Sequence, residues 1–232
     1  MKKERFRKIF GLGGAILWLI AAGTVPIIRG MAEEPRYTVV VDPGHGGTDG
    51  GAVGDDGTVE KHLNLSIASL LKEKLEKKGI TVIMTRQTDE DTDGLTGFHK
   101  RQDLEQRAKI GNESGADVYV SIHINASNAR RDQGFQAWYG SGNPDGKRLA
   151  ECITASVEDK SICTRIRAVK QVPETLYIFR TVTIPSVLVE CGFISNSADL
   201  YQLKQEGFRN EMCEALCDGI VAYLTESNSR IT

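Results

Sequence analysis

Four residues suited to metal binding or acid–base catalysis stand beside separate segments of the chain. His45 and His123 each follow an apolar, β-branched run that predicts a buried strand, and Glu190 follows another. Glu60 opens a run with helical spacing. Two imidazoles and one carboxylate can hold zinc and leave a position for water, and a second carboxylate can move protons on and off that water. This combination predicts a hydrolase.

In the predicted mechanism, His45, Glu60 and His123 bind zinc, which lowers the pKa of a bound water from about 15.7 to about 7. Glu190 accepts a proton from this water as it attacks a carbonyl group, and returns the proton to the leaving amine. Amide cleavage needs the second transfer as well, because an amine leaves poorly unless it is protonated.

Each of these residues also has a plainer explanation. A single histidine after a strand is more often an ordinary surface or core residue, and Glu60 could be an acid that the helix dipole favours. Glu190 is harder to explain in this way, because a carboxylate between apolar runs is costly to bury without a partner. We expect His62 and His99 to take no part. Cys191 is a conceivable nucleophile, but its apolar surroundings should raise its pKa.

Strand-like and helix-like segments alternate along most of the chain. This alternation predicts a single α/β domain with helices on both faces of its sheet. Ligands of such sheets collect beyond the carboxyl ends of the strands, so the four residues should converge on one edge. The expected strands cover 37–41, 80–85, 117–122, 135–139, 176–179 and 186–189, and the expected helices cover 60–78, 102–112, 146–159 and 208–224.

The first 30 residues differ from the rest of the chain. Residues 1–8 are basic, and residues 9–28 are uncharged and mostly apolar. A helix of about 20 apolar residues spans the hydrocarbon core of a bilayer, and the basic flank predicts that the rest of the chain lies outside. A cleavable signal is the alternative, because Gly30 and Ala32 resemble a small-x-small cleavage site, although Arg29 fits poorly. Either interpretation predicts an exported protein, membrane-anchored or secreted.

Composition argues against several other functions. The chain has 232 residues, 26% of them charged, with a net charge of -2, which indicates no nucleic-acid partner. Its five cysteines form no CxxC pair and indicate no disulfide framework; Cys213 and Cys217 should be buried thiols on one helix face. We expect a basic segment with a membrane anchor or signal at 1–30, a linker at 31–36, a catalytic domain at 37–225 and a polar tail at 226–232.

Several segments, taken in order, resemble the zinc-dependent N-acetylmuramoyl-L-alanine amidases of the type 3 family. The matching stretches are Asp42-Pro-Gly-His-Gly-Gly, Glu60-Lys-His-Leu-Asn-Leu, Thr85-Arg86, Ser121-Ile-His-Ile-Asn-Ala and Val187-Leu-Val-Glu-Cys-Gly-Phe-Ile-Ser-Asn196. The resemblance implies that His45, Glu60 and His123 are zinc ligands and Glu190 is the catalytic glutamate. It also implies a mixed, mainly parallel six-stranded sheet, and cleavage of the amide between the muramic acid lactyl group and L-alanine in peptidoglycan.

Two features resemble the germination-specific amidases of spore formers: the stretch 100–107, and a single domain behind an apolar leader. Those enzymes act on cortex peptidoglycan, where removal of stem peptides precedes formation of muramic-δ-lactam. The short stretch between Asn125 and Gly134 leaves no room for the long blocking helix of division-associated relatives. We expect a monomer that acts on peptidoglycan and contacts the membrane through its N-terminal segment. An activating protein partner is left open.

Two other functions stay open on the sequence alone. One is a different zinc hydrolase, such as a peptidase or a carbohydrate deacetylase, that uses the same residues. The other is a cell-wall-binding protein without catalytic activity.

Overall fold

The computed structural model describes residues 37–94, 97, 99–141 and 143–228. These residues belong to one compact unit, Glu34–Thr232. The predicted leader and linker lie outside the described residues, so the expectations for them stay predictions. Within the described ranges, no helix combines the length and the apolarity needed to cross a membrane.

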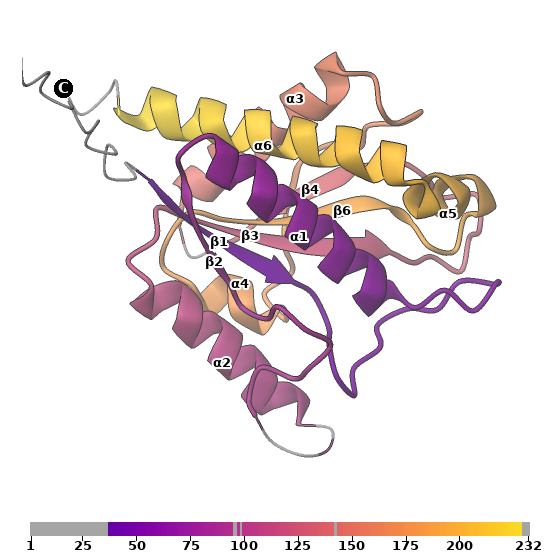
Figure 1. Cartoon of the computed structure of the whole chain (residues 1–232), viewed down its shortest axis with the longest axis horizontal. Helices are drawn as coiled ribbons and strands as arrows, with labels where there is room; N and C mark the ends of the chain where they lie inside the picture. Colours follow the sequence, from indigo (N-terminus) through magenta and orange to yellow (C-terminus); the bar gives the residue numbers. More distant parts are fainter. Residues whose placement is uncertain (1–36, 95–96, 98, 142, 229–232) are drawn as a thin grey trace, which may run out of the picture. The chain divides into compact units, whose positions relative to one another are not determined.

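A six-stranded sheet forms the centre of the domain (Figure 1). Its strands are β1 (Thr38–Pro43), β2 (Thr81–Met84), β3 (Val118–Asn125), β4 (Gln136–Tyr139), β5 (Lys170–Gln171) and β6 (Ser186–Phe193). Their order across the sheet is β2-β1-β3-β6-β4-β5. All neighbouring pairs are parallel except β4 and β6, which run antiparallel. The predicted mixed, mainly parallel sheet is therefore confirmed.

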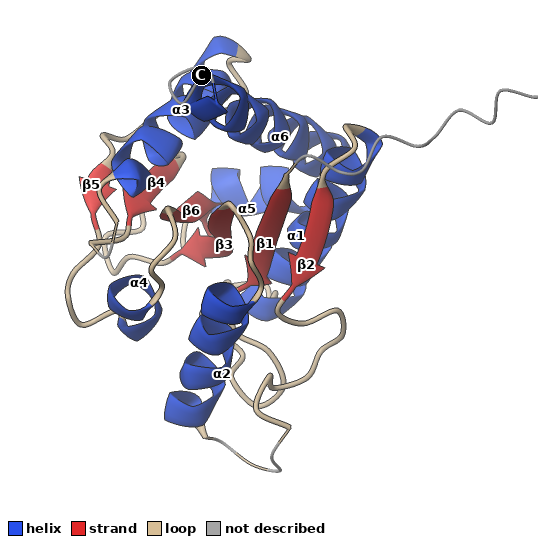
Figure 2. Cartoon of the chain, turned by 90° about the vertical axis from the view of Figure 1, so that its left-hand side faces the viewer, coloured by secondary structure: helices blue, strands red, loops and turns tan. Residues whose placement is uncertain are grey.

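Helices cover both faces of this sheet (Figure 2). Four lie on one face: α1 (Glu60–Lys77), α3 (Asp145–Asp159), α5 (Ser197–Lys204) and α6 (Glu206–Asn228). Two lie on the other: α2 (Lys100–Glu113) and α4 (Tyr177–Thr181). Each face has its own apolar cluster, the larger around Leu71 and Ile153 and the smaller around Tyr119 and Phe179. The sheet is thus buried on both sides, as parallel strands require.

The helix α1 shows how the sequence produces this packing. Its apolar residues recur every three or four positions, so they form one stripe that packs against the sheet and α6. Gly79 ends the helix with a φ of 77°, a conformation that costs glycine little, and Ile80 N then donates to Leu75 O at 3.2 Å. The buried stripe consists of Leu63, Ile67, Leu71 and Leu75.

Some elements differ from the prediction. The expected strand at 176–179 is wrong: this segment belongs to helix α4, because a short apolar run has no period that separates strand from helix. Helix α5 was not predicted, although Asn196 caps it by accepting from Ala198 N and Asp199 N. Helix α6 begins at Glu206 and continues to Asn228.

Candidate active site

His45, Glu60 and His123 meet at the carboxyl edge of the sheet. One nitrogen or oxygen atom from each lies within 4.8 Å of the other two. His123 Nδ1 is 3.0 Å from Glu60 Oε1, and His45 Nε2 is 3.3 Å from Glu60 Oε2. The structure thus brings together the three residues chosen from the sequence as metal ligands, and we call them the triad.

Glycines allow the backbone to approach the triad this closely. A Cβ atom on Gly44 would overlap the His123 ring, and one on Gly51 would overlap Glu60 Oε2 and the His45 ring. His45 itself has a φ of 59°, a left-handed conformation that is uncommon for a residue with a side chain. Such conformations persist where the surrounding structure holds them, and they are frequent at functional sites.

Glu60 is held as a carboxylate at the start of α1. It is 3% exposed, its Oε1 accepts from Ile124 N at 3.1 Å and from Asn64 Nδ2 at 3.2 Å, and its Oε2 accepts from Ala52 N at 2.9 Å. Burial raises the pKa of Glu60, but hydrogen bonds and charge from His123 and His45 outweigh it and keep the pKa well below its ordinary value. The carboxylate is therefore both charged and fixed in orientation.

His45 lies between two carboxylates. Its Nδ1 is buried and 3.0 Å from Asp49 Oδ2; the two attract as charges, although the geometry does not satisfy a hydrogen bond. Burial lowers the pKa of His45, but Asp49 and Glu60 outweigh it and raise the pKa to about 9. His45 in turn lowers the pKa of Asp49 to about 2. A cation in the triad would therefore compete with a proton on His45.

Glu190 is adjacent to the triad in the sheet. Strands β3 and β6 extend beyond their predicted ends, so His123 and Glu190 lie within the strands, directly opposite each other. The Glu190 Oε2 atom is buried and has no hydrogen-bond partner among the described residues. Burial and the charge of Glu60 raise the pKa of Glu190 to about 8, against a smaller opposing effect of His45. A carboxyl group that titrates near neutral pH beside a candidate metal site is typical of an acid–base catalyst.

A cavity of about 210 Å³ opens beside the triad. His45 and His123 line it on the side of the sheet. Helices α2 and α4 supply an apolar wall, so the segment whose secondary structure was predicted wrongly borders the site. The apolar residues that line the cavity are Leu104, Leu176, Ile178, Phe179 and Leu188.

A buried polar network lies next to the triad. Asp42 accepts from Arg107 Nη1 at 2.7 Å, Thr85 Oγ1 at 2.6 Å and Ser121 Oγ at 2.6 Å. Burial raises the pKa of Asp42, but Arg107 and the two hydroxyl groups outweigh it and lower the pKa to about 2. No role was predicted for Asp42, Arg86 or Arg107, although for Asp42 a charged residue directly after a buried apolar run was an available signal.

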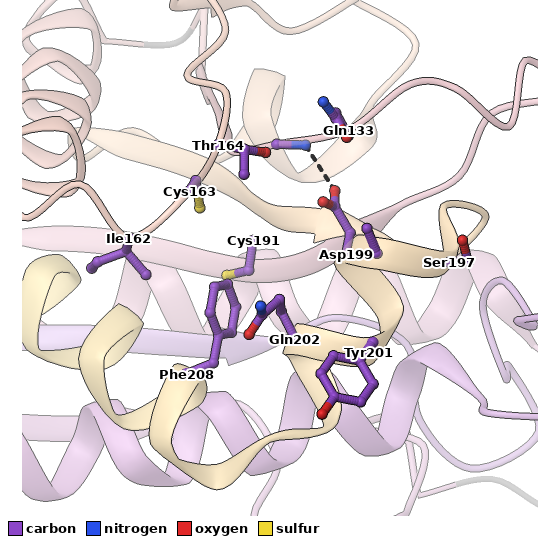
Figure 3. A pocket seen from close by; sticks show the side chains of 12 residues that line it. Gln133, Ile162, Cys163, Thr164, Cys191, Ser197, Asp199, Tyr201, Gln202 and Phe208 are labelled. Atoms are coloured by element: carbon purple, nitrogen blue, oxygen red, sulfur yellow. Dashed lines mark hydrogen bonds between the residues drawn. The ribbon is translucent and has the colours of Figure 1, made fainter.

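A second cavity, of about 350 Å³, lies on the other face of β6 (Figure 3). Cys191 lines it, whereas the preceding residue Glu190 points to the opposite face, since successive side chains of a strand alternate. Burial raises the pKa of Cys163 to about 12 and that of Cys191 well above its ordinary value. Both thiols are therefore protonated and unreactive, as predicted for Cys191. The ionisable groups that could hold a metal therefore lie at the triad, whereas the larger cavity is lined by protonated thiols.

The fold and the site together define a single-domain α/β hydrolase with a candidate metal centre at the carboxyl edge of its sheet. The family model of N-acetylmuramoyl-L-alanine amidases (Amidase_3) matches residues 39–222. The chain belongs to this family, and it is an N-acetylmuramoyl-L-alanine amidase; peptidoglycan is the substrate of the family.

Relatives agree with this assignment. The germination-specific N-acetylmuramoyl-L-alanine amidase of Bacillus subtilis is 34% identical over 192 residues, which are 81% of this chain and 80% of that protein. The probable cell wall amidase LytH of Staphylococcus saprophyticus is 34% identical over 82% of this chain and 59% of its own length. The CwlD amidase of Clostridioides difficile, solved in complex with the GerS lipoprotein, is 35% identical with a TM-score of 0.74, covering 82% of this chain and 98% of that one.

Proposed function

We propose that this amidase is zinc-dependent, with His45, Glu60 and His123 as metal ligands and Glu190 as general base and acid. The convergence of three donor atoms within 4.8 Å, with Glu190 beside them, carries the proposal. Two imidazoles and a carboxylate suit zinc, and three protein ligands leave a position for water in catalytic zinc sites. Bound zinc would make a hydroxide available at neutral pH.

The surrounding residues fit a metal ligand set. Asn64 Nδ2 and two backbone N–H groups hold Glu60, and Asp49 lies against His45. Such second contacts orient metal ligands and are typical of metal sites. In the triad, the carboxylate of Glu60 lies between the imidazole rings of His45 and His123. The backbone at Gly44 and Gly51 lies close against these side chains.

Glu190 and the apolar wall would perform the remaining chemistry. Glu190 would take a proton from the attacking water and give it to the leaving amine of L-alanine. Its raised pKa of about 8 makes the Glu190 carboxylate a stronger base toward the attacking water, and a nearby cation would lower that pKa so that more of the group is ionised at neutral pH. The wall of α2 and α4 would exclude bulk water from the cavity and so strengthen the interactions inside it.

We further propose a role in spore cortex maturation, in which removal of stem peptides precedes formation of muramic-δ-lactam. The similarity to a germination-specific amidase, at 80% coverage of that protein, supports this role. The basic and apolar N-terminal segment supports export, with the domain acting outside the cytoplasm as a monomer. Because the similar CwlD amidase was solved with a lipoprotein, a lipoprotein is the kind of activating partner that we propose.

Mass spectrometry of digested peptidoglycan tests the activity and its metal dependence together. Purified protein should release stem peptides with a free L-alanine amino terminus, and a chelator should stop the reaction until zinc is restored. Release of acetate would indicate a deacetylase, and cleavage within the stem peptide would indicate a peptidase. Unchanged products after complete removal of metal would refute zinc dependence while leaving the amidase assignment intact.

A further inference from the structure

Arg86 is a buried cation whose contacts are unusual. It lies two residues after β2 and is 5% exposed. Every hydrogen bond described for its guanidinium goes to a backbone carbonyl oxygen, and in the described part of the chain no carboxylate lies within ion-pair distance of it. Burial and repulsion from Arg107 lower its pKa to about 10, against the opposing charges of Asp42, Asp89 and Asp103, so it stays charged at neutral pH. A buried charge without a direct ionic partner is costly, so the backbone acceptors of Arg86 must offset part of that cost.

The acceptors of Arg86 are placed around the triad. Its Nε donates to His45 O at 2.6 Å, and its Nη2 donates to Lys61 O at 3.0 Å. His45 is a triad residue, and Lys61 directly follows the triad residue Glu60. One rigid guanidinium therefore joins the backbone of one triad residue, in the loop after β1, to the backbone of α1 one residue after a second. The other acceptors are Pro43 O, Gly44 O and Thr88 O, each at 3.0 Å.

The same contacts support the strained conformation of His45. Its carbonyl oxygen also accepts from Arg107 Nη2 at 2.6 Å, so two guanidinium groups hold one carbonyl group. The φ of 59° at His45 needs such support. The loop is also shaped to admit Arg86, because a Cβ atom on Gly46 would lie 2.8 Å from Arg86 Cδ.

We infer that Arg86 is a positioning residue of the metal site: by holding the carbonyl groups of His45 and Lys61, it sets the separation of His45 and Glu60 before a metal binds. The inference rests on the proposed zinc site. It assigns Arg86 no contact with metal or substrate. Residues that orient metal ligands from outside typically contribute 10- to 100-fold to metal affinity, so an effect of about that size is expected.

Substitutions at Arg86 and at a matched arginine test this inference. Arg86→Met removes the charge and all donors, and Arg86→Lys keeps the charge but loses the planar fork. Arg167 is the control: it is partly buried and donates to a backbone carbonyl, Gln133 O, at 3.1 Å, and it pairs with Asp132, but it contacts none of the triad. Zinc affinity is measured by competition with a chromophoric chelator, and the unfolding temperature is measured with and without zinc.

Arg86→Met should bind zinc about 10- to 100-fold more weakly than wild type, with Arg86→Lys in between. Its zinc-induced rise in unfolding temperature should shrink accordingly, because that rise depends on affinity. Arg167→Met should keep the wild-type zinc affinity, even if its metal-free form unfolds earlier. If Arg86→Met does not fold, the same comparison is made between Arg86→Lys and Arg167→Lys.

The experiment distinguishes failure of the inference about Arg86 from failure of the proposed zinc site. Wild-type zinc affinity in the folded Arg86 variants would overturn the inference and leave the proposed function standing. An equal loss of affinity in the Arg167 variants would also overturn it, since the effect would then be general destabilisation. If the wild-type protein itself bound no zinc, the proposed metal site would fail, and the inference with it.

Discussion

On one face of the sheet, strands β1, β3 and β6 present valine and isoleucine to α1, α3 and α6. On the other face the same strands contribute to the smaller apolar cluster, but near their carboxyl ends they present ionisable groups, each one residue further along. This contrast arises because successive side chains of a strand point to opposite faces. The neighbouring pairs are Val41 and Asp42 in β1, Ile122 and His123 in β3, and Val189 and Glu190 in β6.

Residues on the first face therefore mainly stabilise the fold, whereas the second face carries the ionisable residues of the candidate site. The apolar face gains free energy from burial alone, and its thiols at 191, 213 and 217 stay protonated because burial raises their pKa. The polar face carries charges that would be costly to bury alone. Its charges are compensated by hydrogen bonds, as between Asp42 and Arg107. Substitutions on the apolar face should therefore lower the free energy of unfolding, whereas substitutions in the candidate site should lower activity.

The largest contrast is expected between Glu190 and its neighbour Cys191. Glu190→Ala should lower kcat by about 10²- to 10⁴-fold, the usual contribution of a general acid–base catalyst, with zinc still bound. Cys191→Ala, which changes the opposite face of the same strand, should keep kcat. Turnover of purified muropeptides and zinc content by mass spectrometry measure the two quantities. Full activity in Glu190→Ala would remove Glu190 from the mechanism.

A core substitution should instead lower stability and leave activity and zinc binding unchanged. Leu71 is fully buried in α1 on the apolar face, and Leu71→Ala should cost about 2–5 kcal/mol of unfolding free energy through the cavity it leaves. Below its unfolding temperature the variant should keep its kcat and its zinc affinity. Leu70→Ala, at the partly buried neighbouring position, is the control and should cost less. Urea denaturation measures the loss; a fall in kcat at low temperature would show that the two faces are coupled.

The pH dependence of stability should come from ionisable groups on the polar face. We expect its effect to be smaller than those of Glu190→Ala and Leu71→Ala. The folded-state pKa values of Glu190, about 8, and His45, about 9, are raised above their ordinary 4.5 and 6.5. The folded state thus holds these protons more tightly, and the stability they contribute is present at low pH and lost as pH rises through about 8 and 9. Metal-free protein should unfold earlier at pH 9 than at pH 6.5, by about 2–4 °C for each kcal/mol lost.

Zinc should weaken this pH dependence, because a metal ligand must be deprotonated and zinc would replace the proton on His45. Thermal unfolding at several pH values, with zinc and with a chelator, makes the comparison. Glu190→Gln separates the two groups, since it leaves only the contribution of His45. Identical curves with and without zinc would contradict a metal site that includes His45.

The sequence singled out the four candidate residues because each belongs to a local pattern, and the structure brings three of them together. His45 and His123 follow β-branched runs, Glu60 opens a periodic helix, and Glu190 interrupts an apolar run. The alternation of strand-like and helix-like segments along the sequence predicted the α/β sheet. Bringing the triad together then required only that parallel strands end at the same edge.

Other parts of the site could not be predicted from local sequence patterns. The role of Arg86 depends on backbone carbonyl groups, which every residue has and which leave no trace in a sequence. The wall of the cavity depends on helix α4, where an apolar run of a few residues fits a strand and a helix equally well. The conformation of His45 is also imposed by its surroundings, since a positive φ is uncommon for any residue other than glycine.

The wide spacing of the triad along the chain has a consequence for folding. Glu60 and His123 are 63 residues apart, and Asp42 and Ser121 are 79 apart, so the centre exists only after β1 has paired with β3. Contacts of such long range form slowly and are lost when the whole domain opens. Unfolding of the sheet should therefore release the metal, which a fluorescent zinc indicator can follow, and a fragment that ends before β3 would lack His123 and hold no zinc at all.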